Sequence, residues 1–134
     1  MKYLLDTHIL LWTTDDNPLI PEKIRQLIRN ASNEVYYSSA SIWEVEIKHL
    51  AKPAKMQVDG KTLSLACFNM KFEMLPIEDR HVFYLETLHR EEGAPEHHDP
   101  FDCIMLAQAK CEGMKFITHD SLIPYYNEEC VIKV

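Results

Sequence analysis

The order of apolar and polar residues along the chain predicts short strands separated by helices. Five short apolar runs have the length and the residue types of buried strands, at 3–5, 34–38, 73–77, 114–120 and 130–134. We expect helices between and after these strands, from apolar residues at helical spacing and from helix start and stop signals, at 7–14, 21–31, 39–51, 61–72, 78–90, 99–113 and 121–126. Strands that alternate with helices are typical of the α/β class, so we expect a three-layer sandwich with a mostly parallel five-stranded sheet.

The segment 97–113 carries the clearest helix signals and also two aspartates. Pro100 stands at the first turn of the predicted helix, and Gly113 stands at its end. Asp99, directly before the proline, has the position of an N-cap, and Asp102 then occupies the third helical position. We therefore expect Asp99 mainly to cap the helix, with an additional role as a ligand left open. The side chain of Asp102 is then free to project into a functional site.

Length and composition favour one domain over residues 1–134 of a cytoplasmic protein. No apolar run approaches the roughly 20 residues that a membrane span needs, so we expect no membrane contact. Lys2 and Asp6 interrupt the first apolar segment, which makes it a poor signal peptide. The four cysteines lack the spacing of a zinc site or of a disulfide framework, which is typical of free thiols in a reducing compartment.

Four acidic residues occupy equivalent places in the predicted fold. Asp6 and Asp120 directly follow strands, while Glu44 and Asp102 lie in the first turns of helices. In parallel sheets these positions meet at the carboxyl edge, where ligands bind. Carboxylates brought together repel one another unless a cation neutralises them, and oxygen ligands suit Mg²⁺ or Mn²⁺. Such a centre can activate water against a phosphodiester.

Each of these acids also has a structural interpretation. Asp6 and Asp120 can cap the helical segments that follow them. Glu44 can belong to a capping box that starts at Ser41, or form an ion pair with Lys48 four residues later. Two neighbouring histidines, His97 and His98, are expected to be solvated loop residues, with a phosphate contact as the alternative.

Four segments spread over the chain resemble the PIN-domain ribonucleases, specifically the VapC-type toxins of toxin–antitoxin pairs. They are YLLDTHILLW (3–12), SSASIWEVEIK (38–48), HDPFDCIMLAQA (98–109) and FITHDSLI (116–123). Each segment alone is weak evidence, but together, in this order and at this spacing, they are specific.

The resemblance implies a Mg²⁺- or Mn²⁺-dependent endoribonuclease. Its acidic set would be Asp6, Glu44, Asp102 and Asp120, with Asp6 and Asp102 as direct metal ligands and the other two completing the shell. Supporting roles near the metal would fall to Thr7, Ser38 and Thr118. The resemblance also implies an RNA substrate, a homodimer and a cognate antitoxin that blocks the site. Cys103 stands where this subgroup commonly has arginine, so this chain lacks any RNA or antitoxin contact that the arginine would make.

The formal net charge of −7 argues against a general nucleic-acid coat protein. The segment 44–72 is different, because it has five lysines against three acids. We expect three of these lysines to grip the RNA backbone, namely Lys48, Lys52 and Lys55. The alternative is a solvated helix face. Trp43, next to Glu44, is expected to lie in the core rather than to stack on a base.

Three other functions are compatible with parts of the pattern. A phosphoryl-transfer enzyme of the haloacid-dehalogenase type also begins with a strand and an Asp, but it needs a second Asp where this chain has His8. A response-regulator receiver domain needs an Asp after a middle strand, and neither 34–38 nor 73–77 supplies one. A PIN-fold binding module without catalysis remains a third alternative, which the full acidic set disfavours.

Overall fold

In the computed structural model, which describes residues 1–134, five strands form one sheet in the order β3-β2-β1-β4-β5. All four neighbouring pairs are parallel, so the expected sheet is confirmed and is parallel throughout. The strands are β1 (Lys2–Leu5), β2 (Glu34–Ser38), β3 (Glu73–Leu75), β4 (Lys115–Thr118) and β5 (Val131–Lys133). Because they are all parallel, their carboxyl ends lie at one edge of the sheet.

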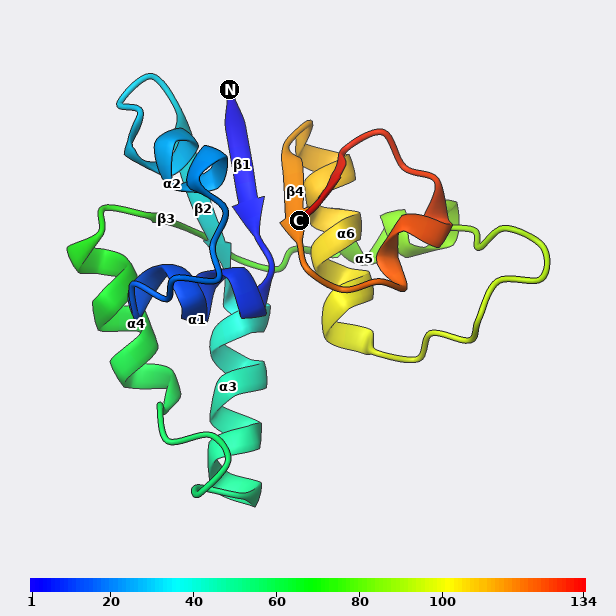
Figure 1. Ribbon diagram of the computed structural model, residues 1–134. Coiled ribbons are helices and arrows are strands. Elements are labelled where there is room, and N and C mark those ends of the chain that lie inside the picture. The colour runs from blue at the N-terminus through cyan, green and yellow to red at the C-terminus, as the bar shows by residue number, and fades with distance from the viewer.

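Helices cover both faces of the sheet, which confirms the three layers (Figure 1). The α-helices are α1 (Thr7–Thr14), α2 (Glu22–Arg29), α3 (Ser39–Ala51), α4 (Gly60–Asn69), α5 (Asp79–Phe83) and α6 (Pro100–Glu112). Two 3₁₀ helices are η1 (Tyr84–Thr87) and η2 (Ile123–Tyr126). No helix has both the length and the apolar character that crossing a membrane would require.

Neighbouring residues of the central strands supply two separate cores. Leu5 and Ile117 face one cluster, which includes residues of α1, α2 and α4. Leu4 and Phe116 face the other cluster, which includes residues of α6 and η2. Side chains of a strand alternate between the two faces of a sheet, so apolar residues at successive positions require cover on both. Each fully buried leucine contributes about 2 kcal/mol relative to an exposed one.

The single helix predicted for 78–90 is wrong, because α5 ends at Phe83 and η1 follows. The hydroxyl of Thr87 donates to the carbonyl of Tyr84 at 2.7 Å, and Lys110 Nζ donates to the carbonyl of Thr87 at 3.2 Å. Side chains thus bind carbonyls that a continuing α-helix would engage with its own N–H groups.

The prediction that Trp43 lies in the core is also wrong, because this residue is 59% exposed. Helix α3 projects from the end of β2 beyond the sheet, so its outer face has little of the chain to pack against (Figure 1). The indole contacts the ring of Phe101, with ring centres 5.1 Å apart. Ile47 and Leu50 follow Trp43 on α3 and are exposed as well.

Candidate metal centre

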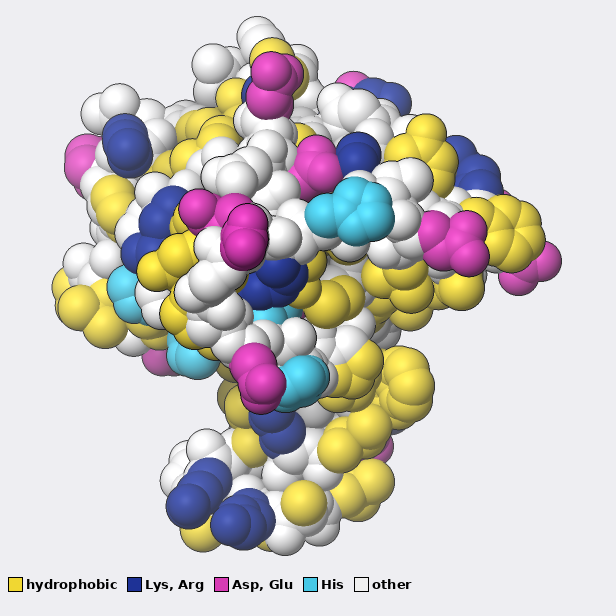
Figure 2. All heavy atoms as spheres, turned by 90° about the vertical axis from the view of Figure 1, so that its right-hand side faces the viewer, with side chains coloured by type: hydrophobic (Ala, Val, Ile, Leu, Met, Phe, Trp, Pro, Cys, Tyr) yellow, Lys and Arg dark blue, Asp and Glu magenta, His cyan; other side chains and the backbone are white.

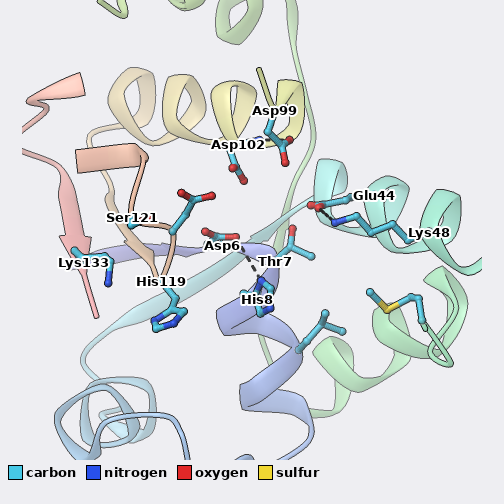
Figure 3. A pocket seen from close by; sticks show the side chains of 13 residues that line it. Asp6, Thr7, His8, Glu44, Lys48, Asp99, Asp102, His119, Ser121 and Lys133 are labelled. Carbon is cyan, nitrogen blue, oxygen red and sulfur yellow. Dashed lines mark hydrogen bonds and ion pairs between the residues drawn. The ribbon is translucent and has the colours of Figure 1, made fainter. Parts of the chain in front are cut away.

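The four acidic residues picked out in the sequence line one open cleft at the carboxyl edge of the sheet. Figure 3 shows the side chains of Asp6, Glu44 and Asp102 directed towards a common space. Asp120 lines the same cleft, whose volume is about 600 Å³. Asp6 follows β1, Glu44 lies on α3, Asp102 lies on α6, and Asp120 follows β4. The cleft is also lined by Asp99 and by two lysines, Lys48 and Lys133. Five carboxylates therefore share this space with two ammonium groups.

Asp6 serves both as a cap and as a wall of the cleft. Its carboxylate accepts a hydrogen bond from the backbone N–H of His8 at 3.3 Å, which caps α1. The hydroxyl of Thr118 donates to the other oxygen, Oδ2. Burial raises the pKa of the Asp6 carboxyl above its ordinary value, and the charge of Glu44 adds to the rise, although the hydrogen bonds from Thr118 and His8 oppose it.

The two aspartates of the DPFD segment lie at the start of α6, and both line the cleft. Asp99 Oδ1 accepts from the backbone N–H of Phe101 at 2.9 Å and from that of Asp102 at 3.2 Å, so its capping role is confirmed. Asp102 is buried against the cleft. Burial raises its pKa to about 9, and the nearby charges of Asp6, Asp99 and Asp120 contribute to this shift.

Glu44 is buried, and only one of its two carboxylate oxygens has a hydrogen-bond partner. Its Oε2 accepts from Lys48 Nζ at 2.5 Å, while its Oε1 is buried without any hydrogen-bond partner. The expected ion pair is therefore present. The capping box is not, because Ser38 caps α3 and the hydroxyl of Ser41 lies 2.8 Å from that of Thr7. Although burial lowers the pKa of Lys48, the hydrogen bond and the charge of Glu44 raise it above its ordinary value.

The residues of the cleft fit a hard divalent cation. A buried carboxylate oxygen without a donor, such as Glu44 Oε1, lacks the partner that a native structure ordinarily provides. The acidic groups offer oxygen ligands, which Mg²⁺ and Mn²⁺ prefer. An ion would also offset the repulsion that raises the pKa of Asp102.

The three hydroxyls expected to support the site occupy different places. Thr7 lines the cleft, and the hydroxyl of Thr118 donates a hydrogen bond to the Asp6 carboxylate. Ser38 does not line the cleft. It is fully buried, where its hydroxyl caps α3 by accepting from Ala40 N at 3.0 Å and donates to Gln108 Oε1 at 2.6 Å. Ser38 thus links α3 to α6 beneath the acidic residues.

The expectation that His97 is a solvated loop residue is wrong. Its side chain is 2% exposed, whereas that of the neighbouring His98 is 81% exposed. His97 Nε2 lies 3.1 Å from Asp102 Oδ2, and its Nδ1 lies 2.8 Å from the hydroxyl of Tyr126. The partner that buries it is 29 residues away in sequence, so no local signal distinguishes the two histidines.

A second group of possible ligands, His81, Cys111 and Glu112, lies away from the cleft. His81 Nδ1 accepts from the backbone N–H of Glu78 at 3.0 Å, and its Nε2 lies 2.9 Å from Glu112 Oε2. The same Glu112 oxygen is 2.5 Å from the Arg80 guanidinium. His81 and Glu112 thus already have hydrogen-bond partners, and their contact joins α5 to the end of α6.

The three lysines predicted to hold RNA lie close to one another at the end of α3. Lys48 lines the acidic cleft, and with Lys52 and Lys55 it also lines a smaller hollow of about 210 Å³ beside Met56. Figure 2 shows basic side chains at the lower end of the molecule, where Figure 1 places the end of α3. Their contact with RNA stays a prediction.

The chain was compared with known proteins. The family model for the PIN domain matches residues 3–127. No match was found among curated proteins. The solved structures that share the fold include VapBC2 from Rickettsia felis bound to a DNA fragment from their promoter, and FitAcB from Neisseria gonorrhoeae. The first is 20% identical with a TM-score of 0.67, covering 100% of this chain and 98% of that chain. The second is 17% identical with a TM-score of 0.62, covering 98% and 96%.

Proposed function

Because this chain belongs to the PIN-domain family, we propose that it is a Mg²⁺- or Mn²⁺-dependent endoribonuclease, the toxin of a type II toxin–antitoxin pair. One observation carries the proposal. Carboxylates from four separate parts of the chain share a single cleft, in which Glu44 Oε1 is buried without a partner. A binding module would not need to gather so much negative charge at a site for a polyanion, whereas a metal-dependent nuclease would.

The side chains have distinct roles in this proposal. When bound, Mg²⁺ or Mn²⁺ would neutralise the carboxylates and act as a Lewis acid towards the phosphodiester. Asp6 and Asp102 would hold the ion directly, and Thr118 keeps the Asp6 carboxylate in place through its hydrogen bond. Glu44 and Asp120 would complete the shell, either directly or through water.

Hydrolysis then follows from the placement of the acids. A water molecule adds to phosphorus in line with the leaving oxygen, the bond from phosphorus to that oxygen breaks, and the proton of the water passes to a carboxylate, while the leaving oxygen takes up a proton from solvent water. We assign this proton to Glu44 or Asp120. Glu44 Oε1 has no competing donor, and Asp120 Oδ1 is held in a turn by the backbone N–H of Leu122 at 2.7 Å.

RNA would enter along the basic end of α3. Lys48, Lys52 and Lys55 adjoin the acidic cleft, so the phosphates next to the scissile bond would meet ammonium groups rather than carboxylates. Lys48 pairs with Glu44 in the metal-free chain, and an ion on the carboxylates would free this lysine for a phosphate.

We further propose that residues 1–134 act as one domain, that the chain is cytoplasmic and forms a homodimer, and that a cognate antitoxin blocks the cleft. The shared fold with VapBC2 and FitAcB supports the assignment to this group of proteins. Sedimentation equilibrium tests the dimer directly. A chain that remains monomeric at micromolar concentration would contradict it.

The test of the activity is cleavage of single-stranded RNA during titration with Mg²⁺ or Mn²⁺, with EDTA as the metal-free condition. Asp6→Asn should abolish cleavage, while Asp59→Asn should leave it unchanged. The two form a matched pair, because each aspartate caps a helix and asparagine caps equally well, but only Asp6 lines the cleft. Cleavage in EDTA would contradict the metal's role. RNA binding without any cleavage would favour the binding module.

A further inference from the structure

His97 lies between Asp102 and Tyr126 in a part of the site that the proposed chemistry does not use. It belongs to the loop that leads into α6, while Tyr126 is the last residue of η2. Both rings are buried, with centres 5.6 Å apart. The imidazole thus joins a candidate metal ligand to a residue from a distant part of the chain.

The partners of the two ring nitrogens fix which way the hydrogen bonds run. When a bound cation keeps Asp102 ionised, its carboxylate can only accept, so the hydrogen between His97 and Asp102 then belongs to His97 Nε2. In the neutral ring, Nδ1 then has a lone pair that accepts the hydroxyl hydrogen of Tyr126 at 2.8 Å. The thiol of Cys103 lies 3.3 Å from the same hydroxyl oxygen and can donate to it. The residue that departs from the family pattern therefore fits into this chain of hydrogen bonds.

Arg90 holds the two ends of this arrangement together. Its guanidinium lies 4.8 Å from the ring centre of Tyr126 and donates to the carbonyl of Leu122 at 2.6 Å. It also donates to the carbonyl of Pro95 at 2.5 Å, two residues before His97. The loop that carries the histidine is thereby tied to the helix that carries the tyrosine.

We propose that His97 is a positioning residue that fixes the orientation of the Asp102 carboxylate, and that Tyr126 orients the imidazole. With Oδ2 held by Nε2–H, the other oxygen of Asp102 is left for a cation. The inference rests on the proposed function, because it assigns Asp102 to the metal. Groups that orient metal ligands in this way contribute about 10- to 100-fold to metal affinity.

The test is the dissociation constant of Mn²⁺, measured by isothermal titration calorimetry on the full chain without RNA. His97→Met should weaken Mn²⁺ binding by about 10- to 100-fold. His97→Gln should recover most of that loss, because glutamine has the same length as methionine and its amide N–H₂ can replace Nε2–H. His98→Ala is the control and should bind as the wild type does, since the His98 side chain is exposed and hydrogen-bonds to Glu96, at 3.1 Å, rather than to Asp102.

Tyr126→Phe tests the second link. It should weaken Mn²⁺ binding in the wild-type background and have no effect when His97→Met is already present, because the tyrosine acts through the histidine. Equal weakening in both backgrounds would overturn the role of Tyr126.

Three results would overturn the inference. If the wild type binds Mn²⁺ and His97→Met binds it equally well, the positioning role is wrong while the proposed function stands. If His97→Gln is as weak as His97→Met, the ring acts by its shape and not by its N–H. If the wild type binds no Mn²⁺ at all, both the inference and the metal-dependent function are wrong.

Discussion

The raised pKa of Asp102 predicts that the metal-free protein loses stability as the pH rises. The group has a pKa of about 9 in the folded chain and an ordinary value of 3.8. The folded state therefore holds a proton that the unfolded state releases above about pH 4. Stability from this group is complete at low pH and declines between about pH 4 and pH 9. Asp6 shifts in the same direction and adds to the decline.

The magnitude follows from the size of the shift. One unit of pKa difference corresponds to about 1.4 kcal/mol, so Asp102 alone sets a ceiling of about 4 kcal/mol of lost stability between pH 4 and pH 7. Water in the open cleft screens the carboxylate, and we expect about half of that value, ~2 kcal/mol. Asp102→Asn removes the titrating group and keeps the shape of the side chain. It should therefore raise the free energy of unfolding at pH 7 by about 2 kcal/mol.

The assay is urea unfolding followed by circular dichroism at pH 5, 7 and 8.5 in EDTA. The control is Asp15→Asn, which removes an exposed carboxylate outside the cleft and should leave the pH dependence unchanged. Addition of Mn²⁺ at about 100 times its Kd should stabilise the wild type by about 2.7 kcal/mol and Asp102→Asn by less. Wild-type stability that stays constant or rises from pH 5 to 8.5, or a variant less stable than the wild type at pH 7, would refute the reasoning.

Three further predictions concern the cap of α3, the end of α6 and the lysines at the end of α3. Ser38→Ala removes the cap of α3 and leaves buried Gln108 with an unpaired oxygen. The free energy of unfolding, measured with urea, should therefore fall by about 2 kcal/mol. A fall below ~0.5 kcal/mol would contradict this role of Ser38. Gly113→Ala should cost about 1 kcal/mol in the same assay, because this residue ends α6 with φ = 68°, and an unchanged midpoint would count against that conformation. Lys48, Lys52 and Lys55 can be replaced together by Gln in the Asp6→Asn background. The slope of log K against log[salt], where K is the binding constant for single-stranded RNA, should then become smaller in magnitude by about 2. An unchanged slope would exclude these lysines from contact with the RNA phosphates.

The sequence predicted the fold and the acidic cluster because both follow from local rules. Strands and helices have different apolar periods, and residues that follow parallel strands meet at one edge. The cap at Asp99 was predictable for the same reason, since Pro100 marks the first helical position and so identifies the residue before it as the cap.

What the sequence did not predict depends on contacts between distant segments. His97 and His98 are neighbours with the same chemistry, and only the packing of Tyr126 buries one of them. Trp43 has the character of a core residue, but α3 extends beyond the sheet and leaves it exposed. Ser41 matched a helix cap by spacing, yet the helix begins earlier, at Ser39, with Ser38 as its cap.

The claim that the acidic residues gather around a divalent cation is tested most directly by a crystal of the protein soaked in Mn²⁺. The anomalous difference map should show a peak in the cleft, bonded to carboxylate oxygens of Asp6 and Asp102. A peak held by Asp99 without Asp102, a peak bonded to His97 Nε2, or no peak in the cleft at saturating Mn²⁺ would contradict it.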